Sequence, residues 1–360
     1  MKKLILFLFF CGAFTVNGQL RNSDVYKVTE IDRSVLRDII RIPDFGGYLT
    51  LKCDFHIHTV FSDGKVWPDV RVNEAWQQGL DAIAITDHIE YRPLKDIVKG
   101  DLNESFKIAK KTGDAIGFTV IQGTEITRSK PIGHLNALFI SDANPMETED
   151  PLDAIDIAIG QGAFIMWNHP GWPDDKSTLY PVHEKLIKEK KIHGVEVFNH
   201  TEYYPVSFDW CRDMGLAFMG NSDIHGLVSE LYGGCKLARP LTLVFASEHS
   251  EKGIKEALFD GRSAVYFHGQ LVGKAEHLTA LFKASLVWKV KDADRRGYEV
   301  SNMSDIGYKI KCGDKLFILP AGKAIGFMLP KDEEKITVLN CFTGMDENLK
   351  IDLKEIIGSN

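Results

Sequence analysis

The chain has 360 residues and a formal net charge of −7 at pH 7, from 43 Lys and Arg against 50 Asp and Glu. This length suits one large α/β domain of barrel size and a smaller second domain, with enough interior to bury a core. The mildly acidic balance gives no electrostatic footprint for nucleic acid, so we expect none among the partners. The six cysteines include no CxxC pair, which argues against a zinc ribbon or a redox motif.

The first residues have the pattern of an export signal. A basic start at Lys2 and Lys3 precedes an apolar run over residues 4–10, and small residues lead up to Gly18. The apolar run is too short to anchor the chain in a bilayer. We therefore expect a signal peptide over residues 1–18, cleavage near Gly18-Gln19, and a periplasmic or extracellular protein without a membrane span.

Short apolar runs then alternate with amphipathic ones. The apolar runs predict strands over residues 51–55, 82–86, 118–123, 135–140, 163–167, 194–198, 216–220 and 241–246. The amphipathic runs predict helices over residues 68–78, 94–111, 152–159, 181–190, 207–214 and 251–260, with Gly79 and Gly113 as helix ends. Near-continuous apolar strands indicate a parallel sheet, and repeated βα units indicate a barrel or a doubly wound sheet.

The pattern changes after about residue 282. Short strands are predicted over residues 285–290, 307–312, 315–319, 324–329, 335–341 and 349–353, separated by Gly, Pro and Asp. This spacing is typical of a small all-β, sandwich-like domain. It contains no histidine, so we expect support or substrate access from it, not chemistry. We therefore expect the mature chain to divide into an α/β domain over 19–282 and a β-domain over 283–360.

Residues that bind metals gather at the ends of the predicted strands. His56 and His58 lie two apart in an extended segment, so both imidazoles point the same way and can hold one ion. The full set is His56, His58, Asp63, His88, Glu125, His134, His169, Asp223 and His225. Taken singly, each has an ordinary structural alternative, such as a turn residue for Asp63. Because the carboxyl ends of barrel strands meet on one face, we expect the nine to converge.

Six histidines and three carboxylates exceed what one tetrahedral ion needs. Imidazole with carboxylate suits zinc, manganese or iron, so two to three divalent ions are predicted. Five other histidines in the α/β domain have no strand-end placement, and we expect packing or surface roles for His183, His193, His249, His268 and His277. Asp87 is expected either to orient the imidazole of His88 or to cap a turn.

From about residue 50 to 270 the sequence resembles the PHP (polymerase and histidinol phosphatase) superfamily. The resemblance rests on residues 54–59, 62–64, 79–88, 123–125, 168–170, 194–198 and 221–225, which occur in the family's order. It implies a distorted (β/α)7 barrel of the TIM type and up to three metal ions. The export signal and the trailing β-domain resemble the secreted branch of that superfamily.

The same resemblance implies a division of the ligands among the ions. A first ion would be held by His56, His58, Glu125 and Asp223. A second would share Glu125 and use His134 and His169. A third would use Asp63, His88 and His225, with Asp63 standing where some members carry histidine.

These residues predict a metal-dependent phosphoesterase. It would hydrolyse small phosphomonoesters or phosphodiesters by metal-activated hydroxide at a di- or trinuclear site, with Glu125 as the bridging ligand. Arg128 and His200 are expected to contact the phosphate or protonate the leaving oxygen, and Trp172 to shape the pocket. The alternative is an amidohydrolase-like enzyme that cleaves C–N or C–O bonds with the same cluster; the lack of a strand-end lysine disfavours it. A non-catalytic metal-binding protein is a third reading.

Overall fold

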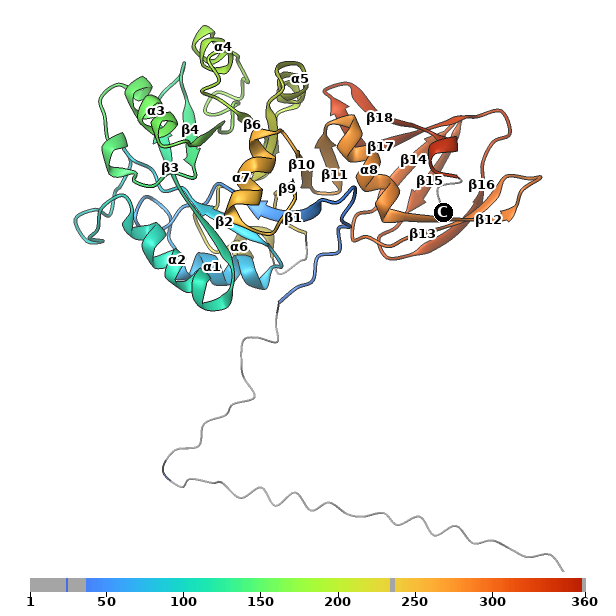
Figure 1. Ribbon diagram of the computed structural model, residues 1–360, viewed down its shortest axis with the longest axis horizontal. Coiled ribbons are helices and arrows are strands. Elements are labelled where there is room, and N and C mark those ends of the chain that lie inside the picture. The colour runs from blue at the N-terminus through green and yellow to red at the C-terminus, as the bar shows by residue number, and fades with distance from the viewer. Residues whose placement is uncertain (1–23, 25–36, 234–236, 358–360) are drawn as a thin grey trace, which may run out of the picture. The chain divides into compact units, whose positions relative to one another are not determined.

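The computed structural model describes Asp24, residues 37–233 and residues 237–357. The expected signal peptide over residues 1–18 lies outside these ranges. The chain from Arg37 onward forms one compact unit of mixed α/β structure (Figure 1). Within the described ranges, no helix combines the length and the apolar character needed to cross a bilayer.

The part of this unit up to residue 273 alternates strands with helices. Its strands are β1 (Leu49–Asp54), β2 (Ala82–Ile85), β3 (Thr119–Thr127), β4 (His134–Leu138), β5 (Phe164–Trp167), β6 (Gly194–Asn199), β7 (Glu202–Tyr203), β8 (Ala217–Asn221), β9 (Leu241–Ala246), β10 (Ser263–Phe267) and β11 (Gln270–Gly273). Its helices are α1 (Pro68–Gln77), α2 (Glu104–Ile116), the 3-10 turn η2 (Asn144–Met146), α3 (Pro151–Gly160), α4 (Pro181–Lys188), α5 (Pro205–Met214), α6 (Val228–Tyr232) and α7 (Glu251–Phe259).

Helix α2 differs from its prediction over residues 94–111. It begins at Glu104 and continues through Gly113, which was expected to end it. A Cβ at Gly113 would lie 2.6 Å from Val120 Cγ2, so this glycine lets the helix lie directly against β3. The helix ends instead at Gly117, whose φ of 66° is left-handed.

The sheet is mixed, which corrects the prediction of a parallel one. β1, β2 and β3 are mutually parallel, as are β5, β6 and β8. β4, however, runs antiparallel to both β3 and β5, and β9 runs antiparallel to β1. Only residues 128–133 join β3 to β4, and so short a link makes a hairpin, whereas a parallel crossover needs a dozen residues or more.

The sheet curls so that the segments after β1 and β8 meet. An isolated parallel bridge joins Ile57 to Ile224, and the His58 amide donates to the Ile224 carbonyl at 3.2 Å. The Thr242 hydroxyl of β9 donates to the Gly220 carbonyl at 2.9 Å. The segments after β1 and β8 both carry predicted ligands, so this closure brings together residues that are far apart in the sequence.

The remainder of the unit is rich in β-structure and is drawn in orange to red in Figure 1. After α8 (Ala275–Ser285) come β12 (Leu286–Asp292), β13 (Gly297–Asn302), β14 (Tyr308–Cys312), β15 (Lys315–Leu319), β16 (Ala324–Met328), β17 (Lys335–Gly344), β18 (Glu347–Asp352) and the turn η3 (Leu353–Glu355). β12, β13 and β16 form a separate sheet, while β14, β15, β17 and β18 extend the main one through pairing of β17 with β11.

Two sheets facing each other make this part sandwich-like. Phe317 of β15 stacks across the two sheets on Phe327 of β16, with ring centroids 4.5 Å apart. Within the smaller sheet, Trp288 of β12 meets the same Phe327 edge-on. The mixed α/β fold with a β-rich second part is therefore confirmed. The predicted division between residues 282 and 283 falls inside α8, and it stays a prediction.

Candidate metal centre

All nine predicted ligands converge at the closed end of the curled sheet. Their donor atoms form four overlapping groups, within each of which the atoms lie no more than 4.8 Å apart. The groups are His58, Asp63, His88 and His225; His56, His58 and Glu125; His56, His169 and Asp223; and Glu125, His134 and His169. The overlaps make this one continuous cluster able to hold metal.

The buried centre of the cluster lies just beyond β1. His56 Nε2 is 3.1 Å and His58 Nε2 is 3.2 Å from the same Glu125 oxygen, Oε2. The two histidine nitrogens also lie 3.3 and 3.0 Å from Asp223 Oδ1. The extended backbone thus points both imidazoles toward the same two carboxylates, as their spacing predicts.

The second oxygen of Glu125 faces a different group. Oε1 is 2.7 Å from His134 Nδ1 and 3.9 Å from His169 Nε2. His134 reaches this place because β4 runs antiparallel, so that its first residue lies beside the end of β3. Glu125, which has no solvent exposure, therefore spans two groups of donors.

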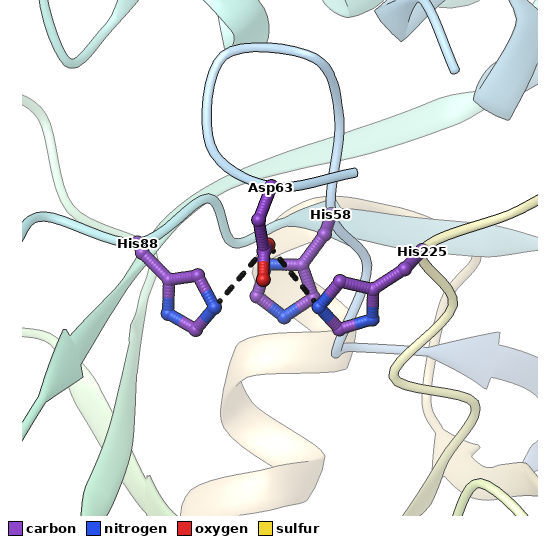
Figure 2. A group of neighbouring side chains, drawn as sticks. All are labelled: His58, Asp63, His88 and His225. Atoms are coloured by element: carbon purple, nitrogen blue, oxygen red, sulfur yellow. Dashed lines mark ion pairs between the residues drawn. The ribbon is translucent and has the colours of Figure 1, made fainter. Parts of the chain in front are cut away.

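Asp63 lies between His88 and His225 in one of the four groups (Figure 2). Its Oδ1 is 3.2 Å from His225 Nε2 and 3.4 Å from His88 Nε2, and both of those rings stack against His58 (Figure 2). The following Gly64 is required here because a Cβ would lie 2.7 Å from the backbone of His58. The glycine lets the loop fold back and place Asp63 over the histidines.

Several atoms of the cluster are buried without a hydrogen bond, although charged groups lie close by. They are His58 Nε2, Asp63 Oδ1, Glu125 Oε1 and His134 Nδ1. Native proteins leave few such atoms, because an unsatisfied buried polar group is costly. Imidazole nitrogens with carboxylate oxygens are the donors that divalent zinc, manganese and iron accept. The residues present therefore fit divalent metal ions.

The electrostatics of the cluster agree with this. Burial raises the pKa of the Glu125 carboxyl, but the charges of His88 and His56 outweigh burial and hold it well below its ordinary value. Burial lowers the pKa of His58, whereas the neighbouring carboxylates of Asp223 and Glu125 raise it to about 9. The ionised carboxylates thus favour protonated imidazoles. A metal ion would compete with these protons for the ring nitrogens.

Two charged residues hold the loops that carry the ligands. Arg71 of α1 is 1% exposed, and its guanidinium donates to the carbonyl oxygens of His58, Ile224, His225 and Gly226. The sequence analysis missed this role; the only sign of it was an arginine on the face of α1 that also carries Val72 and Ala75.

Asp87 caps a turn, which is the second of its two predicted roles. Its carboxylate accepts hydrogen bonds from the Thr59 amide at 2.7 Å and from the Ser62 hydroxyl at 2.6 Å. The His88 ring lies instead against the Thr127 hydroxyl, with Nδ1 2.6 Å away. Asp87 therefore holds the turn that leads to Asp63 and does not orient His88.

The cluster opens into a cavity of about 340 Å³. Its wall contains seven of the nine predicted ligands together with Trp172, Asn199, His200, Glu202 and Tyr204. His200 and Trp172 were expected here, whereas Asn199, Glu202 and Tyr204 were not. Among the described residues, no lysine or arginine lines this cavity.

Arg128 lies outside that wall. Its guanidinium pairs with Glu90 Oε1 at 3.1 Å and donates to the Thr148 carbonyl at 2.6 Å. It lines a neighbouring space of only about 10 Å³, which shares His134 and His169 with the cluster. The structure thus engages Arg128 elsewhere, and its contact with phosphate stays a prediction.

The other histidines of this part of the chain pack against ordinary neighbours. The buried His183 stacks on Trp167 with ring centroids 3.8 Å apart. His193 accepts a hydrogen bond from the Ile165 amide at 3.0 Å, and His249 Nε2 lies 3.3 Å from the Asp81 carbonyl. Among the described residues, no metal-binding group includes these histidines, His268 or His277.

Comparison with known proteins agrees with the geometry. The model of the PHP domain matches residues 54–203. The crystal structure of a two-domain protein from Bacteroides vulgatus, which contains a predicted PHP-like metal-dependent phosphoesterase, is 39% identical. The match covers 88% of this chain and 98% of that one, with a TM-score of 0.83.

A second relative is more limited in extent. An uncharacterized protein of Methanocaldococcus jannaschii is 37% identical over 81 residues, which are 22% of this chain and 36% of that protein. The match therefore spans only about a third of that relative's length. The likeness to the Bacteroides vulgatus protein, by contrast, extends over nearly all of both chains, and on this ground the chain belongs to the PHP family.

Proposed function

We propose that this protein is a metal-dependent phosphoesterase that hydrolyses small phosphomonoesters or phosphodiesters. The observation that carries the proposal is the continuous cluster of six histidines and three carboxylates, four of whose buried atoms lack a hydrogen bond. The relationship to the Bacteroides vulgatus protein supports the same activity. A cavity of about 340 Å³ has the size of a small-molecule site.

Each group of donors is assigned to part of a site for two or three ions of zinc, manganese or iron. Glu125, His134 and His169 would hold one ion, and Asp63, His88 and His225 another, with His58 beside them. His56, His58, Glu125 and Asp223 would hold the buried ion. Glu125 would be shared between two of the ions, because its two oxygens face different groups.

The reaction follows from the chemistry of such a site. When bound, the ions lower the pKa of water and neutralise negative charge on the phosphoryl group. The cavity wall offers no lysine or arginine among the described residues, so contacts to the rest of the ester fall to other polar side chains of the wall, such as Asn199 and His200. His200 Nδ1 lies 3.1 Å from the Thr201 hydroxyl, which leaves Nε2 to protonate the leaving oxygen.

Two further assignments belong to the same proposal. Residues 1–18 would be removed during export, which places the enzyme in the periplasm or outside the cell. The mature protein would consist of the hydrolase domain over 19–282 and the β-domain over 283–360. Amino-terminal sequencing of the protein recovered from the periplasm of an expression host checks the cleavage site.

Elemental analysis of protein purified without chelators tests the proposal, paired with turnover of p-nitrophenyl phosphate and bis-p-nitrophenyl phosphate. We expect two to three ions per chain and cleavage of at least one ester. Glu125→Ala should reduce turnover by at least about 100-fold, since it removes a shared ligand. Glu184→Gln is the control, because this exposed residue of α4 belongs to no group of the cluster.

Two results would contradict the proposal. The first is the absence of turnover of both esters after the protein has been reloaded with zinc, manganese or iron. Cleavage of p-nitroanilides or carboxylic esters alone would favour the amidohydrolase-like alternative, which uses the same kind of activated water.

A further inference from the structure

Glu196 is a buried carboxylate that the proposed reaction does not use. It lies in β6, where the neighbouring Val195 and Val197 pack into the apolar core. Its side chain is 0% exposed, and among the described residues no lysine or arginine forms an ion pair with it. A carboxylate in such a place is costly unless its oxygens are well satisfied.

Four polar groups lie within hydrogen-bonding distance of the Glu196 carboxylate, two at each oxygen. Oε1 accepts from Asn221 Nδ2 at 3.0 Å and lies 3.0 Å from His56 Nδ1. Oε2 accepts from the His169 amide and from Asn199 Nδ2, each at 2.8 Å. The orientation of Asn221 is fixed because its Oδ1 accepts from the Phe55 amide at 2.8 Å. Every neighbour therefore donates, which suits an ionised carboxylate that only accepts.

This arrangement determines the proton position on His56. Because Glu196 accepts, His56 Nδ1 carries the hydrogen, and the lone pair of a neutral ring remains on Nε2. That nitrogen points to Glu125 Oε2 at 3.1 Å and to Asp223 Oδ1 at 3.3 Å. The other tautomer would place a hydrogen where an ion should bind.

Glu196 also holds the backbone of a second ligand. His169 has a φ of 23°, a left-handed value that is unfavourable for a residue with a side chain. The hydrogen bond from its amide to Glu196 holds this conformation, from which the imidazole reaches the cluster. His56 and His169 belong to one donor group with Asp223, so one carboxylate positions two of its three members.

We propose that Glu196 is a positioning residue of the metal centre. It selects the Nδ1–H tautomer of His56, holds the backbone of His169, and adds a buried negative charge beside the group formed by these two residues and Asp223. The inference rests on the proposed metal site but not on the identity of the substrate. Histidine ligands that donate to a carboxylate typically lose 10- to 100-fold in metal affinity when that carboxylate is removed.

Glu196→Gln is the test, since it keeps the size of the side chain but removes the charge and half of the accepting capacity. Zinc affinities are measured by titration against a competing chelator. We expect one class of site to weaken by about 10- to 100-fold. The outer group of His58, Asp63, His88 and His225 should keep its affinity, because none of its members contacts Glu196. Glu184→Gln, which removes the same charge from the exposed face of α4, should change neither.

A spectroscopic measurement on the unmutated protein keeps the proposal testable if the variant does not fold. Long-range ¹H–¹⁵N correlation of the zinc-loaded protein, labelled at histidine, should show His56 protonated at Nδ1 and bound through Nε2. Protonation at Nε2, or unchanged zinc affinities in a folded Glu196→Gln protein, would overturn the inference. A protein that binds zinc with this tautomer but cleaves no phosphate ester would refute the proposed function alone, whereas one that binds no zinc would refute both.

Discussion

At the scale of single residues, the outer part of the cluster depends on one carboxylate. Asp63 Oδ1 is the oxygen that lies near both His88 and His225, and it is buried without a hydrogen bond. Glu125, by comparison, offers two oxygens to two different groups. Loss of Asp63 should therefore affect one ion, whereas loss of Glu125 should affect two.

We predict that Asp63→Asn lowers the metal content by one ion per chain and leaves the others in place. The amide keeps the shape of the side chain but removes the charge that attracts the ion. Elemental analysis after dialysis against buffer without metal measures the change. Equal losses in Asp63→Asn and Glu125→Ala would show that the cluster does not divide as we propose.

His193 provides a residue-scale prediction outside the metal centre. Burial lowers its pKa to about 4, and its Nδ1 accepts a hydrogen bond from the Ile165 amide, which requires the neutral ring. The unfolded chain has a histidine pKa near 6.5. The stability contributed by the neutral ring is thus fully present above pH 6.5 and is lost as the pH falls toward 4.

His193→Asn should remove this pH dependence while its amide oxygen keeps an acceptor for Ile165. From the difference between the two pKa values, the wild-type protein should lose at most about 3 kcal/mol more than the variant between pH 6.5 and 4. Urea denaturation at several pH values gives both curves. Parallel losses in the two proteins would mean that His193 does not titrate in the way described.

At the scale of elements, the position of α2 depends on glycine. Gly113 lies where a Cβ would meet Val120 Cγ2 at 2.6 Å and the Phe118 carbonyl oxygen at 2.7 Å. One of these atoms belongs to the backbone, so the contact is relieved only if the helix moves away from β3. Gly160, the last residue of α3, has no such neighbour within 4 Å.

Gly113→Ala should therefore destabilise the protein by about 1–3 kcal/mol, as overpacking does. Gly160→Ala is the matched control and should be neutral or stabilise by about 0.4–1 kcal/mol through the entropy of the unfolded chain. Free energies of unfolding from urea titration compare the two. A Gly113→Ala protein as stable as the control would mean that α2 does not lie as close to β3 as the structure places it.

The same element shows why part of the pattern was misread. Gly113 looked like a helix end because glycine weakens helices, but close packing outweighed that preference. Arg71 was overlooked for a related reason. Nothing in its position on α1 indicates that four carbonyl oxygens from two distant loops lie around it.

At the scale of the whole molecule, metal binding should be linked to folding stability. The donors come from segments between residues 56 and 225 and assemble only when the sheet closes. An unfolded chain lacks this arrangement, so ions bind the folded state preferentially.

Removal of metal should consequently lower the melting temperature. At a free ion concentration 1,000 times Kd, a single site stabilises the folded state by about 4 kcal/mol. Differential scanning calorimetry before and after dialysis against EDTA, and again after addition of zinc, measures the shift. An identical melting temperature in all three states would argue against ions bound to this cluster.

By itself the sequence determined which residue types stand at the ends of the strands. The nine predicted ligands, the mixed α/β character and the β-rich second part follow from local patterns: apolar runs, their spacing, and polar residues directly after them. These features are readable because strand and helix periodicity is a property of neighbouring residues. The nine residues form a cluster because the strand ends that carry them lie on one face.

Only the tertiary structure decided the direction of β4, the ion pair of Arg128 with Glu90, and the hydrogen-bond partners of Glu196. Each of these depends on a partner distant in sequence or on the path of a short loop. Glu196 looks like any carboxylate within an apolar strand until β1, β5 and β8 bring His56, His169 and Asn221 around it. Hydrogen bonds act over about 3 Å in space, so their partners cannot be read from positions that the chain separates by dozens of residues.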